Sequence, residues 1–404
     1  MTGHDFHTRS VDACPFMPVF APPSIELVRG SGTEVWDSNG NRYLDFLAGI
    51  AVVSLGHSNP VVAEAISKQA ATLVHVSNFF ANPVANRAAL QLVDLIEEAT
   101  GERGQIFFTN SGAEANECAI KLARRATESD RHVVVSALGS FHGRTLATLA
   151  ATGQPAKHVP FEPMPAGFRH VPFGDLAALE SALGDDVAAV IIEAVQGEGG
   201  VIPSPPGYLL GIRELCDRTG ALMIVDEIQT GFGRTGSWFG FQHDLVDASP
   251  DVITMAKALG NGMPIGACWA KRSVSAAFRP GDHGSTYSGG ALATAAASAV
   301  IAEMRRLEAP SLARRRGAEL AEQLVAIDGV ESVRGRGLLL GAQLVEGLSA
   351  ADIAVAALHH GLIVNAVNPT TLRLAPPLTV NDEEIRQCVT ILGEVIDSST
   401  AEAP

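Results

Sequence analysis

The sequence predicts an α/β protein with a large domain built on a mostly parallel sheet and a smaller α+β domain. Short apolar runs alternate with amphipathic stretches through the middle of the chain, as a parallel sheet with crossover helices requires. The 404 residues are too many for one ordinary core and too few for three domains. Hydrophobic residues make up 47% and glycines number 40, which suits buried strands joined to helices by tight turns.

Each element is assigned from its local pattern. Residues 25–56 contain short strands around a turn at Asn39-Gly40, which predicts a hairpin. Helices are predicted at 61–73, 85–100, 114–125, 205–220, 291–308, 311–327 and 381–399. Strands of the large sheet are predicted at 105–110, 132–137, 188–195, 221–228 and 251–257, and strands of the small domain at 330–345, 362–367 and 371–378. We expect an N-terminal segment at 1–59 that packs on the small domain, a large α/β domain at 60–294 and a small domain at 295–404.

Composition argues against several classes of function. Acidic residues outnumber basic ones 44 to 29 and no segment is rich in Lys or Arg, so a nucleic-acid partner is not expected. The first residues do not resemble a signal peptide and no run of 18 apolar residues occurs, so we expect a cytoplasmic protein with no membrane partner. No metal is expected, because neither histidines nor cysteines show the spacing of a metal site. Free and mostly buried thiols are predicted for Cys14, Cys118, Cys216, Cys268 and Cys388.

The polar residues that end the apolar runs are the candidate site. Ligands of open α/β sheets bind outside the carboxyl ends of the strands, so these side chains should converge. They are Thr109, Asn110, Ser111, Gly112, Glu193, Gln196, Asp226, Gln229 and Lys257.

The turn at Ser111-Gly112-Ala113 leads from a strand into a helix. Small residues let the backbone approach a ligand, and the first amides of the helix present free N–H groups to it, which indicates a phosphate cup. The alternative is an ordinary helix start in which Ser111 caps the helix and Glu114 completes a capping box.

Two charged residues end fully apolar runs. Asp226 follows Ala-Leu-Met-Ile-Val, and a carboxylate there needs a cation or several donors, such as a protonated pyridine nitrogen. The alternative is a neighbouring Arg or loop amides. Lys257 ends the next run, and an amine partly buried beside another cation has a lowered pKa and becomes a nucleophile toward an aldehyde. The alternative is a lysine whose amine reaches solvent.

The chain resembles a known family. The segments SGAEANECAIKLAR, SFHGRTLATLAATG, IIEAVQGEGGV, LMIVDEIQTGFGRTG, DVITMAKALGNGMPIGA and HGSTYSGG are similar, in order and over almost the whole chain, to the class III, ornithine-type aminotransferases. That family has fold type I of the enzymes that depend on pyridoxal 5'-phosphate (PLP). The N-terminal segments WDSNGNRYLDFLAGIAVVSLGHSNP and HVSNFF resemble its acetylornithine branch.

The resemblance implies a role for each matching residue. Lys257 would be the catalytic lysine that holds PLP as a Schiff base. The other cofactor contacts would be Ser111, Gly112 and Ala113 at the phosphate, Phe141 stacked on the ring with His142 beside it, Asp226 at the ring nitrogen, Gln229 near the phenolic oxygen, and Thr286 at the phosphate of the neighbouring subunit. For the substrate, Arg144 would bind the far carboxylate, Arg373 the near one, Glu198 would pair with Arg373 and release it, and Ser285 would lie close by. The expected assembly is a homodimer with shared sites.

The function implied is transamination of N-acetyl-L-ornithine with 2-oxoglutarate, which yields N-acetyl-L-glutamate 5-semialdehyde and L-glutamate in arginine biosynthesis. Ornithine, succinylornithine and 4-aminobutyrate are alternative donors within the same family. A PLP enzyme that does not transaminate, such as a racemase or an aminomutase, is the alternative of another class.

Overall fold

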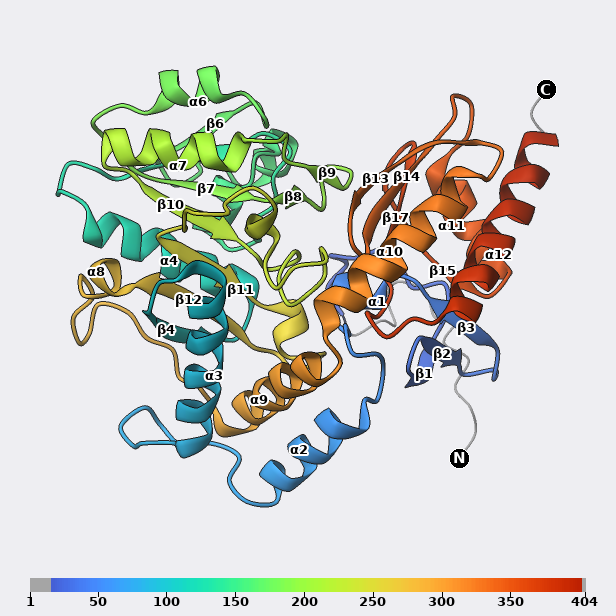
Figure 1. The fold of residues 1–404 in the computed structure, drawn as a ribbon, viewed down its shortest axis with the longest axis horizontal. Coiled ribbons are helices and arrows are strands. Elements are labelled where there is room, and N and C mark those ends of the chain that lie inside the picture. The colour runs from blue at the N-terminus through green and yellow to red at the C-terminus, as the bar shows by residue number, and fades with distance from the viewer. Residues whose placement is uncertain (1–15, 402–404) are drawn as a thin grey trace.

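The computed structural model describes residues 16–401. Figure 1 shows two bodies side by side, one built on a large sheet and one on smaller sheets near the C-terminal helices. The predicted division at residues 59/60 and 294/295 stays a prediction, and the first 15 residues of the N-terminal segment, with Cys14, lie outside the described part.

A seven-stranded sheet forms the first body, in the order β4-β12-β11-β10-β7-β5-β6. Its strands are β4 (Gly104–Thr109), β5 (Val133–Ala137), β6 (Phe168–Val171), β7 (Val187–Glu193), β10 (Leu222–Asp226), β11 (Val252–Met255) and β12 (Gly266–Lys271). All adjacent pairs are parallel except those that β12 makes with β4 and β11. The five predicted strands are present; the sequence interpretation missed β6 and β12.

The central strands are buried on both faces, which explains their continuous apolar runs. Ile191 and Ile224 join a cluster under α4 (Gly112–Ala126), whereas Ile192 and Val225 join the main core on the opposite face. Neighbouring residues therefore fill different cores, and the carboxyl end of each strand is held by packing on both sides.

Helices begin where the sequence supplies caps. Asn59 accepts hydrogen bonds from Val61 N and Val62 N at the start of α2 (Pro60–Ala70), and Asn82 does the same at α3 (Pro83–Thr100). Each then has a proline at its first helical position, where no N–H is needed. The long helix α9 (Ala291–Arg306) packs along both. The remaining helices of this body are α5 (Leu146–Ala151), α6 (Leu176–Ala182), α7 (Tyr208–Thr219) and α8 (Arg272–Ser275).

The second body contains a four-stranded sheet in the order β13-β14-β17-β16. Its strands are β13 (Val330–Arg336), β14 (Leu339–Leu344), β16 (Asn365–Asn368) and β17 (Thr371–Leu374), and its helices are α10 (Ala309–Val325), α11 (Ala350–His359) and α12 (Asp382–Ala401). The N-terminal strands β1 (Leu27–Ser31), β2 (Glu34–Asp37) and β3 (Arg42–Asp45) reach this body because β3 pairs in parallel with β15 (Leu362–Ile363). Helix α1 (Ala48–Ala51) and the hairpin β8 (Val195–Gln196) and β9 (Ile202–Pro203) complete the fold.

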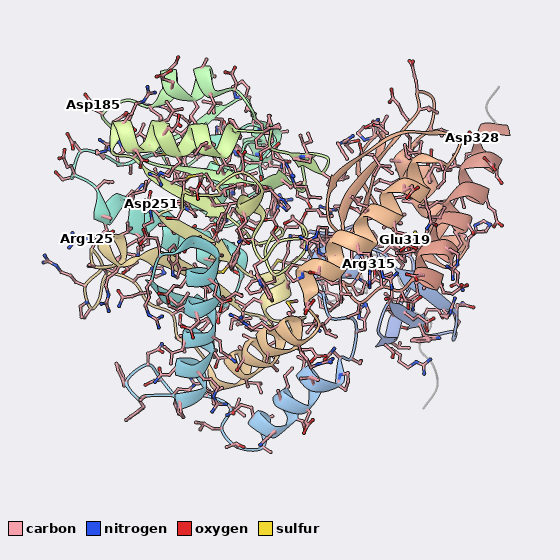
Figure 2. All side chains as sticks on the ribbon, in the orientation of Figure 1. Arg125, Asp185, Asp251, Arg315, Glu319 and Asp328 are labelled. Atoms are coloured by element: carbon pink, nitrogen blue, oxygen red, sulfur yellow. The ribbon has the colours of Figure 1, made fainter. Side chains whose placement is uncertain are left out.

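A buried ion pair lies at the edge of the large sheet where β11 begins. Arg213 Nη1 lies 2.7 Å from Asp251 Oδ2, and the same oxygen accepts a hydrogen bond from Met223 N at the start of β10. Figure 2 labels Asp251 within this body. The carboxyl edge opposite holds a different set of polar groups.

Over residues 16–401, no helix has the length and apolar character that a bilayer crossing needs, and no cluster of His, Cys, Asp and Glu could hold a metal ion. The four described cysteines are buried free thiols.

Candidate active site

The carboxyl ends of three parallel strands bring the central polar residues together. Asp226 ends β10, pairs in register with Glu193 at the end of β7, and on its other side pairs with Thr254 of β11. Lys257 follows β11. The convergence expected from the alternating pattern is therefore found among these residues.

Three donors surround the Asp226 carboxylate, which is only 4% exposed. Its Oδ2 accepts hydrogen bonds from Asn116 Nδ2 and His142 Nδ1, each at 2.8 Å, and its Oδ1 accepts one from Ile228 N at 3.0 Å. Among the described residues no Arg or Lys lies within ion-pair distance of it. A carboxylate can accept about four hydrogen bonds, so capacity remains for a protonated ring nitrogen.

The turn at the start of α4 has features of both a capped helix start and a phosphate cup. Ser111 Oγ accepts from Glu114 N at 3.2 Å and caps the helix. The Glu114 carboxylate does not complete a capping box with Ser111; it reaches Asn110, accepting from the backbone N at 2.9 Å and from Nδ2 at 2.8 Å. The free first amides of this 15-residue helix stay available for an anion.

Close packing around the start of α4 requires glycine at two positions. A Cβ on Gly112 would lie 2.7 Å from Ile228 Cδ1, and one on Gly143 would lie 2.9 Å from Ala113 Cβ. The backbone at the cup is therefore packed closely on two neighbouring loops, and Gly112 and Ala113 are held by contacts that larger residues would break.

Lys257 is held in a left-handed backbone conformation with φ of 41° and is partly buried. Within the described residues no hydrogen bond engages its amine. Burial, followed by the nearby Arg373 guanidinium, lowers the pKa of Lys257 to about 8, against the opposing effect of Glu198, Asp226 and Glu193. The amine is thus uncharged at mildly alkaline pH, the state in which it is a nucleophile and a base.

Arg373 and Glu198 form an ion pair at 2.6 Å. Arg373 is 1% exposed, while the Glu198 side chain keeps 31% of its surface. Arg373 Nη2 also donates to Asn365 Oδ1 at 2.8 Å, and Nη1 to Gly197 O at 3.3 Å. Burial acts to raise the pKa of Glu198, but the contacts with Arg373 outweigh it and the pKa is lowered. The lowered pKa favours the charged carboxylate in this ion pair.

Two cations lie near the ring of Phe141. The Arg144 guanidinium carbon and the Lys157 amine each lie 5.5 Å from the centre of its ring. Its backbone N donates to Glu193 Oε2 at 3.2 Å. Burial and then the Asp226 carboxylate raise the pKa of Glu193 well above its ordinary value, so this group favours the neutral form.

Ser285, Thr286 and Gln229, three further predicted residues, differ in their surroundings. Ser285 Oγ accepts from Asn110 Nδ2 at 3.1 Å, which places its loop against the phosphate cup. The next residue, Thr286, is exposed. Gln229 packs over Gly197, where a Cβ would lie 1.9 Å from the Gln229 Oε1.

Buried atoms without partners mark where a ligand would fit. Within residues 16–401 these include Asn116 Oδ1, His142 Nε2, Gln229 Oε1 and Arg373 Nε. Unsatisfied buried polar atoms are costly, and those of Asn116 and His142, whose side chains contact Asp226, fit a polar ring compound such as PLP. The residues present therefore fit the cofactor that the family resemblance implies.

Sequence reasoning missed four members of this site. Asn116 and Asn365 contact Asp226 and Arg373, and Lys157 adds a cation beside Phe141. Arg234 follows Gln229 by five residues in the chain. Asn116 follows Ala113 by three residues on the same helix, so its inward position could have been read from helical periodicity. The other three gave no local signal.

Known proteins are similar to this chain over almost its whole length. The sequence profile described as aminotransferase class-III matches residues 18–396. An acetylornithine aminotransferase of Corynebacterium efficiens is 48% identical over 93% of this chain and 94% of the relative, and one of Mycolicibacterium smegmatis is 43% identical over 95% and 96%.

Solved structures give the same result. The ornithine aminotransferase of Toxoplasma gondii superposes with a TM-score of 0.89 at 33% identity, covering 96% of this chain and 93% of that one. The N-acetylornithine aminotransferase of Stenotrophomonas maltophilia superposes with a TM-score of 0.81 at 36% identity, covering 94% and 97%.

Proposed function

Because the chain belongs to the class III aminotransferases, which depend on PLP, we propose that it transfers the distal amino group of N-acetyl-L-ornithine to 2-oxoglutarate. The products are N-acetyl-L-glutamate 5-semialdehyde and L-glutamate, in a step of arginine biosynthesis. Relatives named for this donor at 43–48% identity support the choice. The observation that carries it is the Arg373–Glu198 ion pair beside Lys257, because a releasable arginine suits two substrates of different charge.

The family resemblance implies the proposed cofactor contacts, and the arrangement of these residues supports them. The amides at Ser111, Gly112 and Ala113 would hold the phosphate, and Asp226 would hold the proton on the ring nitrogen. Phe141 would cover the ring, with His142 fixing Asp226 and Gln229 near the phenolic oxygen. When bound at Lys257, PLP supplies an electron sink for negative charge at the substrate carbon.

The protein's own contribution is orientation and proton transfer. Lys257 Nζ, whose lowered pKa favours the uncharged amine, would take the proton from the reacting carbon and return it one step later. Arg144 would bind the far carboxylate of acetylornithine while Glu198 neutralises Arg373. When glutamate or 2-oxoglutarate enters, its near carboxylate would replace Glu198 on Arg373, with Ser285 close to the substrate.

A homodimer in the cytoplasm forms part of the same proposal. Phe79, Phe80 and Tyr287 are 93%, 70% and 66% exposed, a concentration of apolar surface typical of an interface. Asn78 donates to Ser285 O, so these residues adjoin the loop from which the exposed Thr286 would reach a partner's cofactor. The four described free thiols accord with a reducing compartment. Sedimentation analysis tests the dimer, and a monomer at working concentration would contradict it.

Steady-state kinetics of the holoenzyme with acetylornithine, ornithine, succinylornithine and 4-aminobutyrate test the donor. We expect the highest kcat/KM with acetylornithine, and a higher value for any of the others would replace this assignment. Sustained transamination with 2-oxoglutarate would exclude an aminomutase. Release of a keto product would exclude a racemase.

A further inference from the structure

Arg234 is a fully buried cation with no acidic partner among residues 16–401. It is 0% exposed, and its guanidinium donates to three neutral oxygens: Nη1 to Leu338 O at 2.9 Å and Pro376 O at 2.5 Å, and Nη2 to Ser54 Oγ at 3.0 Å. Its Nε has no partner. A guanidinium buried without a countercharge is destabilising, and burial lowers the pKa of Arg234 to about 9. Stability alone does not account for such a residue.

The three oxygens belong to three separate parts of the fold. Ser54 follows α1, Leu338 lies in the turn between β13 and β14, and Pro376 lies just beyond β17. Arg234 itself lies on the loop after β10, eight residues beyond Asp226. One side chain therefore ties the loop after the Asp226 strand to the strand that carries Arg373.

Backbone contacts around Arg234 leave this joint little freedom. Leu338 N donates to Arg234 O at 2.9 Å, and a Cβ on Gly337 would lie 2.5 Å from the same oxygen. Leu378 N donates to Ser54 O at 2.7 Å. Contacts with Ser54 and with Arg234 thus fix the segment around Pro376, which follows Arg373 by three residues. The hydrogen bond from Arg234 connects this segment to the loop after β10.

We propose that Arg234 is a positioning residue, which holds Arg373 at the distance from Asp226 that the near carboxylate of glutamate or 2-oxoglutarate requires. This inference rests on the proposed role of Arg373. Arg234 should therefore affect the two half-reactions unequally. The glutamate half, which uses Arg373 to bind a carboxylate, should depend on Arg234 more than the donor half, in which Glu198 stays paired with Arg373.

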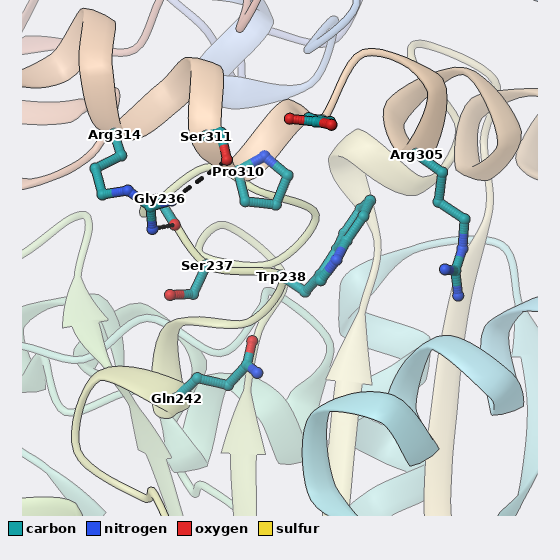
Figure 3. Close-up of a pocket in the computed structure, with 9 residues that line it drawn as sticks. Gly236, Ser237, Trp238, Gln242, Arg305, Pro310, Ser311 and Arg314 are labelled. Carbon is teal, nitrogen blue, oxygen red and sulfur yellow. Dashed lines mark hydrogen bonds between the residues drawn. The ribbon is translucent and has the colours of Figure 1, made fainter.

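Arg314 of α10 provides a matched control, because it contacts the loop that carries Arg234. Its Nη1 donates to Gly236 O at 2.8 Å and its Nη2 to Ser311 Oγ at 3.3 Å, as Figure 3 shows at the edge of a surface pocket of about 430 Å³. Arg314 also joins the first body to the second, but through α10 and from an exposed position. It has no contact with the end of β17 among its described hydrogen bonds.

The test compares the holoenzymes of Arg234→Met, Arg234→Lys and Arg314→Met in single-turnover experiments on each half-reaction. For Arg234→Met we expect the apparent dissociation constant of 2-oxoglutarate, taken from the concentration dependence of the single-turnover rate, to rise about tenfold or more. The same constant for the donor should change about threefold or less. The reason is that a displaced Arg373 weakens the carboxylate contact that binds 2-oxoglutarate. Arg234→Lys should recover part of the loss, since its amine can still donate to one carbonyl. Arg314→Met should leave the ratio of the two half-reactions unchanged.

Equal slowing of both halves by Arg234→Met, or equal effects of Arg234→Met and Arg314→Met, would overturn the proposal and reduce Arg234 to a general contact between the two bodies. If Arg234→Met does not fold, Arg234→Lys and Ser54→Ala decide the matter: an unchanged ratio of half-reactions in both would overturn it. A wild type that does not use acetylornithine would refute the proposed donor only, because the glutamate half can be measured with any donor the wild type accepts.

Discussion

Nδ1 of His142 donates a hydrogen bond to the carboxylate of Asp226 at 2.8 Å, although 84 residues separate them in the chain. Both side chains are buried, and Asn116 shares the same carboxylate oxygen. The hydrogen bonds orient the acid toward the space where a ring nitrogen would lie. The orientation of the Asp226 carboxylate therefore depends on the loop after β5 as well as on β10.

His142→Ala should weaken PLP binding by about 1.5–3 kcal/mol, because a hydrogen bond to a charged group is lost in a buried place. Titration of the apoprotein with PLP, followed by absorbance, measures the change. His158→Ala is the control, since His158 Nε2 bonds to Thr152 O and not to Asp226. Equal losses in the two variants would show that the His142 contact is not specific to the cofactor acid.

Glu198→Ala should leave Arg373 permanently free for substrate. We expect faster reaction with α-amino donors and 2-oxoglutarate and slower reaction at the distal amine of acetylornithine. Arg373→Ala should instead cost the glutamate half about 2–5 kcal/mol of binding free energy, with a smaller effect on the acetylornithine half. Single-turnover rates of the two halves check both expectations, and parallel slowing of both halves would leave the ion pair with a structural role only.

Capture of PLP by the apoprotein should accelerate as the pH rises through about 8, because Lys257 reacts as the free amine and its pKa is lowered to about 8. The folded state releases this proton at lower pH than the unfolded chain, so the contribution of Lys257 to the free energy of unfolding rises with pH between about 8 and the ordinary lysine value. Stopped-flow absorbance from pH 6 to 10 gives the midpoint.

Arg373→Gln should move that midpoint upward, since Arg373 is a cation that lowers the pKa of Lys257. Lys257→Ala should abolish both the capture and turnover. An unshifted midpoint in Arg373→Gln would leave burial as the only cause, and turnover by Lys257→Ala would overturn the assignment of this lysine.

Asp251→Asn should lower the free energy of unfolding by about 3–5 kcal/mol, because it leaves Arg213 buried without its main partner. The exposed Asp217 lies 2.7 Å from the same arginine, and Asp217→Asn should cost about 1 kcal/mol or less. Urea unfolding of both variants measures the difference. Similar costs would show that burial does not strengthen the Asp251 contact.

The sequence alone determined the α/β class and five strands of the large sheet, and it predicted that Asp226 and Lys257 would lie at the carboxyl ends of two of them. Buried strands leave continuous apolar runs, and a charge that ends such a run needs a partner, so both features are local. Strand β12 escaped this reasoning because its short run, Gly-Ala-Cys-Trp-Ala-Lys, contains no β-branched residue and only one large apolar side chain.

The pairing of residues far apart in the chain was decided only by the tertiary structure. Family resemblance indicated that Glu198 and Arg373 meet, but their 2.6 Å contact, the Asn365 partner and the cations around Phe141 depend on how two bodies pack. Arg234 is the clearest case: its buried guanidinium bonds to Ser54, Leu338 and Pro376. Two of those acceptors are backbone carbonyls, which every residue carries, so no side-chain pattern in the sequence could have identified them.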